Sequence, residues 1–224
     1  MKVCTDACLF GAWTAAIITG KPERISSVLD IGSGTGLLSL MLAQKLKTPI
    51  NAIEIDLPAY EQTKENFENS DWKELLNAMH GDILTLEQQT LYALVITNPP
   101  FYEKELRSPA AAVNMARHDT SLTLEALVRK VCALLKEEGY FSIMLPWHRY
   151  DSMLKIASEN GLILSALLRV KQSPKHDFFR AMMLFEKTKK PQRETLIRDL
   201  TIKEIHHQYS ENFIEYLKDY YLSL

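Results

Sequence analysis

Short apolar runs alternate along the chain with more polar stretches of helical length. The apolar runs are the size of strands, and several are rich in β-branched side chains, which is typical of buried strands. They predict strands at 28–31, 50–55, 78–80, 92–97, 140–145, 162–170 and 181–185. The stretches between them predict helices at 37–46, 58–69, 122–136 and 147–160.

The order of these elements predicts a single α/β sheet. Strands that alternate with helices of this length form parallel sheets with helices on both faces. Only a polar, basic connection separates the last two strands, 162–170 and 181–185, so we expect them to pair antiparallel at one edge. The predicted fold class is α/β, a doubly wound, mostly parallel seven-stranded sheet with an antiparallel final strand.

The C-terminal tail carries an aromatic stripe. From residue 203 onward, apolar side chains recur at helical spacing, at Ile205, Tyr209, Phe213, Tyr216 and Tyr220. A stripe of this kind usually packs against the rest of a domain. We therefore expect a main domain at 1–190 and a C-terminal helical extension, packed on it, at 191–224.

Composition narrows the class of protein. The 224 residues are 46% hydrophobic and 24% charged, an ordinary globular balance, and the length suits one domain. Twenty-six basic and twenty-eight acidic residues give a net charge of −2, which excludes coating of nucleic acid through overall basicity but not a local basic face. Cys4, Cys8 and Cys132, an odd and scattered set, argue against a disulfide framework and favour a reducing cytoplasm. Asp6 before the apolar run 7–18 argues against a signal peptide, and no later run is long enough to cross a bilayer.

The first predicted strand ends in a glycine loop, Gly32-Ser33-Gly34-Thr35-Gly36. Glycines at a strand-to-helix turn let the backbone bend tightly and approach a ligand, and open α/β sheets bind ligands outside the carboxyl ends of their strands. A dinucleotide-binding loop needs its third glycine one position later, where this chain has Leu37. Asp30, just before the loop, is unfavourable beside a pyrophosphate but suits a ligand with an ammonium and a sulfonium group. These residues favour S-adenosylmethionine.

Carboxylates also lie at the ends of the next two predicted strands. Glu54 is placed to accept hydrogen bonds from two ribose hydroxyls, and Asp82 from the amino group of adenine. One carboxylate at a strand end usually caps a helix, but Asp30, Glu54 and Asp82 fall at three successive strand ends on one edge of the sheet. We therefore expect a cofactor site there. Its predicted residues are Asp30, Gly32, Ser33, Gly34, Gly36, Glu54, Ile55, Asp82, Ile83 and Asn98.

The fourth predicted strand delivers Asn98-Pro99-Pro100-Phe101 to the same edge. An exocyclic amine on an aromatic base is a poor nucleophile because its lone pair is delocalised. The side-chain carbonyl of Asn98 and the backbone carbonyl of Pro99 are placed to accept its two hydrogens and aim the lone pair at a methyl group. The prolines stiffen the loop, and Phe101 offers a face for base stacking. We predict Asn98, Pro99, Pro100 and Phe101 as the catalytic set, in preference to a simple turn.

With these motifs, the chain resembles the class I S-adenosylmethionine-dependent methyltransferases, in the N-methylating branch with an Asn-Pro-Pro-aromatic motif. Within that branch it is similar to the tRNA1(Val) adenine-37 N6-methyltransferase family at 1–13, 28–36, 52–56 and 116–122. The resemblance implies a Rossmann-like methyltransferase fold, and cofactor contacts from Lys2, Thr5 and Asp6 as well. Family members carry an N-terminal lead before the segment that begins here at Lys2.

A basic stretch at 169–193 supports an RNA partner. It holds eight basic and two acidic residues, a local charge of +6, and such clusters give sequence-independent affinity for phosphates. A solvated hairpin surface is the other interpretation. The predicted RNA-binding residues are Arg117, Arg169, Lys171, Lys175, Arg180, Lys189, Lys190 and Arg193. We expect no membrane partner and no metal site, because His206-His207 and the Cys4/Cys8 pair lack further ligands at metal spacing.

The leading hypothesis is transfer of a methyl group from S-adenosylmethionine to the N6 amine of adenine in tRNA, in the cytoplasm. The alternative keeps this chemistry and changes the acceptor to guanine N2 of ribosomal RNA, adenine N6 of DNA or a protein glutamine. A nicotinamide-dependent reductase is suggested by the glycine loop and Glu54, but the early third glycine and Asn98 argue against it. An RNA-binding module without activity is a further hypothesis. The oligomeric state is left open.

Overall fold

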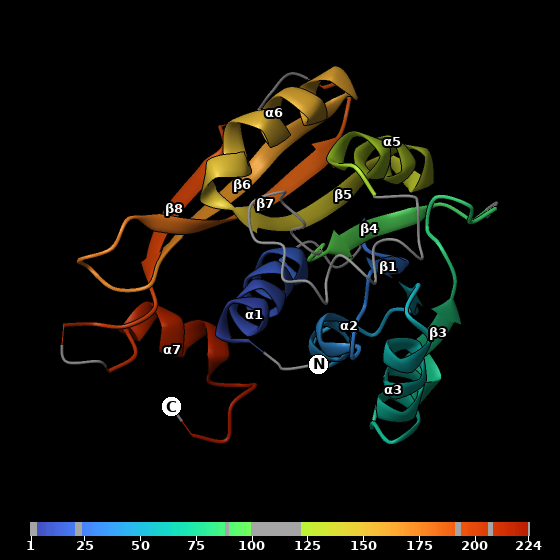
Figure 1. Cartoon of the computed structure of the whole chain (residues 1–224), viewed down its shortest axis with the longest axis horizontal. Helices are drawn as coiled ribbons and strands as arrows, with labels where there is room; N and C mark the ends of the chain where they lie inside the picture. The colour runs from blue at the N-terminus through green and yellow to red at the C-terminus, as the bar shows by residue number, and fades with distance from the viewer. Residues whose placement is uncertain are drawn as a thin grey trace, which may run out of the picture.

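The computed structural model describes residues 4–20, 24–87, 90–99, 122–190, 194–205 and 208–223. Eight strands form one sheet in the order β3-β2-β1-β4-β5-β7-β6-β8 (Figure 1). The strands are β1 (Val28–Ile31), β2 (Ile50–Glu54), β3 (Leu76–His80), β4 (Tyr92–Thr97), β5 (Leu135–Pro146), β6 (Leu162–Lys171), β7 (Phe178–Lys187) and β8 (Leu196–Thr201). The helices are α1 (Thr5–Thr19), α2 (Leu37–Ala43), α3 (Leu57–Glu68), α5 (Leu124–Leu134), α6 (Tyr150–Glu159) and α7 (Glu211–Leu217), with short 3-10 turns η2 (Lys73–Leu75) and η3 (Trp147–Arg149).

Most strands run in the same direction. β1 to β5 pair in parallel, and β7 runs antiparallel to both of its neighbours, β5 and β6. The carboxyl ends of β1 to β6 therefore lie along one edge of the sheet, together with the turn that joins β6 to β7. We call this edge the rim, and it comprises residues 30–36, 54–56, 80–84, 97–99, 146–150 and 169–180. The predicted α/β, mostly parallel fold class is confirmed.

The sheet has one strand more than the sequence predicted. β8 comes from the segment that we expected to be a helical extension, and it pairs in parallel with β6. β6 and β7 do pair antiparallel, as predicted, but β8 occupies the edge of the sheet. The sequence did not predict this strand because it lacks the alternation of apolar and polar residues that is typical of a half-buried strand. Leu200 is its only buried residue, and the two adjacent apolar residues Leu196 and Ile197 are both exposed.

The tail helix is shorter than the predicted stripe. Ser210 begins α7, because its hydroxyl accepts a hydrogen bond from Phe213 N at 3.2 Å, a usual N-cap arrangement. Tyr209 precedes this cap and pairs with Lys203 in an isolated β-bridge. In the helical part of the tail, the aromatic stripe faces the domain as predicted. Phe213 is fully buried, and α7 lies against α1 (Figure 1).

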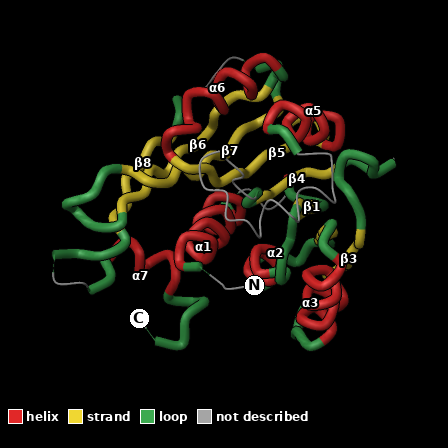
Figure 2. The backbone as a smooth tube through the Cα atoms, in the orientation of Figure 1, coloured by secondary structure: helices red, strands yellow, loops and turns green. Residues whose placement is uncertain are grey.

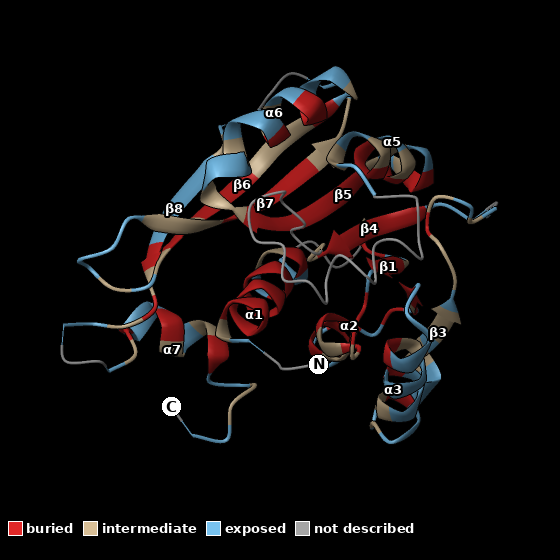
Figure 3. Ribbon diagram, in the orientation of Figure 1, coloured by how far each residue is buried: buried red, intermediate tan, exposed pale blue. Residues whose placement is uncertain are grey.

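Helices cover both faces of the sheet (Figure 2). α1, α2 and α7 lie on one face, and α5 and α6 lie on the other. Side chains alternate between these layers along the central strands: in β4, Leu94 and Ile96 join the cluster under α1, and Val95 joins the cluster under α5. Because both faces are covered, the central strands are buried along their length, whereas β3 at the edge is only half-buried (Figure 3).

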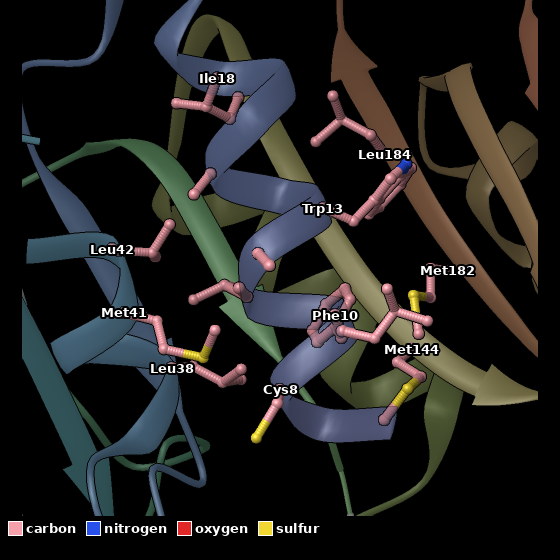
Figure 4. Packing of buried hydrophobic residues seen from close by; sticks show 14 of the residues in the cluster. Cys8, Phe10, Trp13, Ile18, Leu38, Met41, Leu42, Met144, Met182 and Leu184 are labelled. Carbon is pink, nitrogen blue, oxygen red and sulfur yellow. The ribbon is translucent and has the colours of Figure 1, made fainter. Parts of the chain in front are cut away.

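Helix α1 is buried on nearly all sides. Phe10 and Trp13 belong to the cluster between α1 and the sheet, and Trp13 points toward Leu184 of β7 (Figure 4). Thr14, also fully buried, shares a hydrogen bond with Ser142 of β5, with their hydroxyl oxygens 2.8 Å apart. None of the described helices, this one included, is long and apolar enough to span a bilayer.

The Thr14–Ser142 pair gives a test of this packing. Thr14→Val keeps the shape but leaves the buried Ser142 hydroxyl without its partner, so we expect a loss of about 1–3 kcal/mol in the free energy of unfolding. Adding Ser142→Ala removes the stranded hydroxyl and should recover much of that loss. Urea denaturation of the two single variants and the double variant measures the coupling. Strictly additive losses would show that the two hydroxyls do not interact.

Candidate active site

Three buried polar atoms at the rim have no hydrogen-bond partner. They are Asp30 Oδ1, Ser33 Oγ and Asn98 Oδ1, and they are the complete set of such side-chain atoms in the described part of the chain. Asp30 and Ser33 lie at the carboxyl end of β1, and Asn98 follows β4, the strand beside it. Buried polar groups are nearly always paired in folded proteins, so this cluster indicates a place where a ligand supplies the missing hydrogen bonds.

The glycine loop is shaped by positive φ angles and held from two sides. Gly32, Gly34 and Gly36 have φ of 69°, 60° and 79°, the left-handed region that favours glycine. Ile53 O accepts a hydrogen bond from Gly32 N at 2.8 Å, and Thr63 Oγ1 of α3 donates to Gly34 O at 2.8 Å. These two hydrogen bonds, from β2 and from α3, hold the loop in this shape.

The first and last glycines have different surroundings. A Cβ added at Gly36 would lie 2.5 Å from Phe67 Cε1 of α3, so helix and loop fit tightly there. A Cβ added at Gly32 would meet nothing within 4 Å. The backbone at Gly32 therefore faces open space, as it must where a ligand approaches the loop.

Glu54, at the end of β2, joins this loop to the next turn. Its Oε2 accepts from Gly34 N at 2.8 Å, and its Oε1 accepts from Asp56 N at 3.0 Å. The residue is only 8% exposed. A carboxylate has more acceptor sites than these two bonds use, so Glu54 holds both turns and keeps capacity for ribose hydroxyls. The capping and the cofactor-binding interpretations are both compatible with its geometry.

The third predicted carboxylate shapes its own turn. Asp82 Oδ1 accepts from Leu84 N at 2.8 Å, as in an Asx turn. Ile83 is buried in the core, whereas Ile55 is 48% exposed beside Glu54. An exposed apolar side chain at this point offers a surface for a planar base, so Ile55 fits its predicted role better than Ile83 does.

Asp30 is completely buried, which makes its negative charge costly. Ser39 Oγ of α2 donates to Asp30 Oδ2 at 2.8 Å, while no described residue pairs with Oδ1. Burial, together with the nearby charge of Glu54, raises the pKa of Asp30 to about 7, although the hydrogen bonds from Ser39 lower it. A cationic donor such as an ammonium would satisfy Oδ1 and favour the ionised carboxylate. This residue therefore fits the amino-acid part of S-adenosylmethionine.

Asn98 is positioned by the strand that precedes it. Ile31 and Thr97 face each other in the register of β1 and β4, which places Asn98 level with Gly32. Thr97 Oγ1 also donates to Ile31 O at 2.8 Å, so the two strand ends are tied together. The unpaired amide oxygen of Asn98 thus belongs to the same site as the glycine loop, and half-buried Pro99 follows it.

Asp6 and Arg180, which the sequence analysis assigned to different ligands, pair with each other. Arg180 Nε donates to Asp6 Oδ2 at 2.8 Å, and the two side chains are 25% and 12% exposed. The pair connects the first turn of α1, which begins at Thr5, to β7 at the rim. Both residues therefore have a structural role, and their contacts with RNA and cofactor stay predictions.

The predicted basic stretch is divided between two edges of the sheet. Arg169, Lys171 and Lys175 lie at the rim, whereas Lys189 and Lys190 follow the far end of β7. β7 has 10 residues, which separates its ends by roughly 30 Å. Lys190 also forms an ion pair with a glutamate of β5. Only the rim half of the stretch lies at the same edge of the sheet as Asn98.

Several predicted site residues lie outside the described residues: Lys2, Pro100, Phe101, Arg117 and Arg193. In the described ranges, no group of three or more histidine, cysteine, aspartate and glutamate side chains is arranged to hold a metal ion. Cys4, Cys8 and Cys132 are free thiols.

Comparisons with known proteins agree with this geometry. The family model of the Methyltransferase small domain matches residues 14–145. A tRNA1(Val) (adenine(37)-N6)-methyltransferase from Christiangramia forsetii is 37% identical over 229 residues, which cover 100% of this chain and 92% of the relative. Its counterpart from Phocaeicola vulgatus is 35% identical with the same coverage of both proteins. The chain belongs to this methyltransferase family.

Solved structures of more distant methyltransferases share its fold. A predicted O-methyltransferase from Agrobacterium tumefaciens has a TM-score of 0.69 at 15% identity, over 95% of each chain. Magnesium protoporphyrin IX methyltransferase from Synechocystis, solved with bound SAM, has a TM-score of 0.57 at 15% identity, over 79% of this chain and 77% of the other. The predicted family, enzyme class and Rossmann-like fold are confirmed.

The sequence analysis missed the polar side chains that support the methyltransferase site. Ser39 lies against Asp30, and Thr63 and Asn66 of α3 hold the glycine loop, with Asn66 Nδ2 donating to Thr35 O at 2.8 Å. Thr63 and Asn66 are three positions apart and so share one face of a helix. This spacing is the one feature of the sequence from which their shared role in supporting the loop could have been predicted.

The contact between Gly36 and Phe67 makes a specific prediction. Gly36→Ala adds a steric clash to a positive φ, so it should lower the free energy of unfolding by roughly 2–4 kcal/mol. Gly161→Ala is the matched control, since Gly161 has φ of 74° but nothing within 4 Å of the added Cβ, and it should cost about 1 kcal/mol. Urea denaturation compares the two variants. Equal losses would mean that α3 does not press on the loop.

The raised pKa of Asp30 predicts that the stability of the protein depends on pH and that replacing Asp30 changes both stability and cofactor affinity. The folded protein holds a proton on Asp30 up to about pH 7, whereas the ordinary pKa is 3.8, so the stability that Asp30 contributes falls as pH rises between these values. Asp30→Asn stays neutral at every pH. At pH 8 its free energy of unfolding should exceed that of the native protein by on the order of 4 kcal/mol at most, and it should therefore unfold at a higher temperature. The difference should shrink toward pH 5.

The same variant should bind S-adenosylhomocysteine more weakly, because the neutral amide attracts an ammonium less than a carboxylate does. Thermal unfolding across pH and calorimetric titration measure the two effects. A pH-independent difference in stability between Asp30→Asn and the native protein would contradict the raised pKa.

Proposed function

We propose that this methyltransferase transfers a methyl group from S-adenosylmethionine to the N6 amine of adenine in tRNA, with adenine 37 of tRNA1(Val) as the acceptor. The observation that carries the chemistry is the unpaired Asn98 Oδ1 beside the glycine loop. The choice of acceptor is supported by the relatives that carry this activity in their names and match the chain over its whole length.

The cofactor is S-adenosylmethionine, which when bound supplies an electrophilic methyl group on a sulfonium. Asp30 would accept a hydrogen bond from its ammonium, and the backbone at Gly32 would give it room to approach. Glu54 would accept from the ribose hydroxyls, Asp82 would accept from the adenine amine, and Ile55 would provide an apolar surface for the base. The residues present thus match each chemical part of the ligand.

Asn98 acts on the acceptor base. Its amide oxygen accepts one hydrogen of the N6 amine, and the backbone carbonyl of Pro99 accepts the other. Holding both hydrogens out of the plane of the base reduces delocalisation of the nitrogen lone pair and directs it toward the methyl donor. Oriented reactants of this kind reach effective molarities of roughly 10⁵–10⁸ M. The proton released from the amine passes to water, so the reaction needs no strong base at the site.

The other acceptors named from the sequence share this chemistry. Guanine N2, adenine N6 in DNA and a glutamine amide each present a planar nitrogen with hydrogens that Asn98 is able to hold. What favours tRNA is the whole-length similarity to the tRNA methyltransferases. The rim half of the basic stretch, which includes Lys171 and Lys175, favours a polyanionic acceptor over a peptide.

Asn98 variants test the mechanism. Asn98→Ala removes one preorganised acceptor and should lower kcat by about 10²- to 10³-fold, while affinity for S-adenosylhomocysteine stays within a few-fold of the native value. Asn98→Asp keeps an acceptor oxygen and should retain more activity than Asn98→Ala. The assay supplies labelled S-adenosylmethionine to an unmodified tRNA1(Val) transcript, and mass spectrometry identifies the modified nucleoside.

Parallel reactions with a ribosomal RNA fragment, duplex DNA and a glutamine peptide separate the acceptors. Label in N6-methyladenosine of the tRNA supports the proposal. Label confined to guanine, DNA or peptide would refute the acceptor but keep the chemistry. Equal kcat for Asn98→Ala and the native enzyme would refute the role of Asn98.

A further inference from the structure

A row of aromatic rings and cations lies at the rim beyond Asn98. Trp147 stacks on Tyr150, with ring centroids 5.0 Å apart and planes 11° from parallel, and it tilts against Phe178 at 5.3 Å. On β6, the guanidinium of Arg169 lies 4.9 Å from the centre of the Phe178 ring, and the ammonium of Lys171 lies 4.6 Å from it. We call Trp147, Tyr150, Phe178, Arg169 and Lys171 the aromatic row.

The aromatic row lies on the acceptor side of the site. In the order of the sheet, the predicted cofactor carboxylates lie at the ends of β1, β2 and β3, Asn98 follows β4, and the row starts after β5 and continues across β7 to β6. β5 is the neighbour of β4 on the side away from the glycine loop. An acceptor whose reactive base reaches Asn98 from this side therefore has its adjoining groups over the row.

The cations of the row are held against the ring in two different ways. Arg169 donates to both carboxylate oxygens of Asp199 in β8, from Nε at 2.6 Å and from a terminal nitrogen at 3.0 Å. Its guanidinium plane is thereby fixed beside Phe178, and its charge is balanced. Lys171 forms no ion pair with any described residue, so its positive charge is available to a partner.

The chemistry of the row matches a nucleotide chain. Its rings are only half-buried, as are both cations, so the row is not part of the sealed core. Aromatic faces stack on any base without regard to sequence, and lysines beside them neutralise phosphates. A peptide offers a flat face for stacking only at some of its side chains, whereas every nucleotide of a nucleic acid carries both a flat base and a phosphate.

We propose that the aromatic row binds the nucleotides next to the methylated adenine, with bases against the rings of Trp147 and Phe178 and a phosphate at Lys171. This inference rests on the proposed function, because it needs a nucleic-acid acceptor. It changes the set of residues proposed to contact RNA. The aromatic rings are added to the basic stretch predicted from the sequence, and Lys189 and Lys190 at the far end of β7 are left out.

Phe178→Leu tests the aromatic part in the full-length enzyme with the unmodified tRNA1(Val) transcript. Losing one stacking ring should raise KM for tRNA roughly 5- to 150-fold. The kcat at saturating tRNA and the affinity for S-adenosylhomocysteine should stay the same, because the site at Asn98 is intact. Phe178→Tyr restores the ring and should restore KM.

Lys171→Gln tests the phosphate contact. The slope of log affinity against log salt concentration for tRNA should become shallower by about one. Lys47→Gln is the control, since Lys47 is also a lysine without an ion pair to any described residue, but it lies just past the end of α2 that points away from the glycine loop. That variant should leave the slope unchanged.

Binding of tRNA is measured separately by fluorescence anisotropy in the presence of S-adenosylhomocysteine, so the two proposals fail in different ways. A native enzyme that binds tRNA but methylates no adenine would refute the proposed function alone. Unchanged KM, affinity and salt slope in Phe178→Leu and Lys171→Gln, with a loss only in thermal stability, would show that the row merely packs and would overturn this inference.

Discussion

The carboxylate of Glu54 joins the two loops on which the site is built. It accepts from Gly34 N in the glycine loop and from Asp56 N in the turn after β2, and it is shielded from solvent at both. Hydrogen bonds to a shielded, charged acceptor are stronger than neutral ones. Gly34 has a positive φ and lies between β1 and α2, so neither a strand nor a helix supplies a partner for its N–H. Glu54 supplies that partner and so stabilises the shape of the loop.

Residues at the same edge of the sheet also lower the stability of the fold. Asp30, Ser33 and Asn98 each keep a buried polar atom without a described partner, and each such atom lowers stability in the absence of a ligand. The two apolar clusters on the faces of the sheet offset that cost, since strands such as β4 are buried on both sides. The faces of the sheet are therefore closely packed with apolar side chains, whereas the rim keeps buried polar atoms without a described partner.

The rim is divided by charge. The predicted cofactor carboxylates Asp30, Glu54 and Asp82 lie at the carboxyl ends of β1, β2 and β3, and a negative environment suits a ligand that bears an ammonium and a sulfonium. Cations and aromatic rings lie beyond β4, with Lys171 and Phe178 among them. A chain with a net charge of only −2 can thus present opposite surfaces to a cationic cofactor and a polyanionic acceptor. Asn98 stands at the boundary between them.

What the sequence determined by itself is local. The glycine loop, Asp30, Glu54 and the Asn98 turn could be predicted because turn residues and the spacing of apolar positions along a strand or helix depend on near neighbours alone. The tertiary structure decided which distant residues meet. Asp6 pairs with Arg180, and Arg169 with Asp199 of an edge strand whose exposed residues gave no pattern to follow. The length of β7 separates Lys189 from the rim. These contacts follow from strand order and register, which bring together or move apart residues whose local sequence carries no sign of the partner.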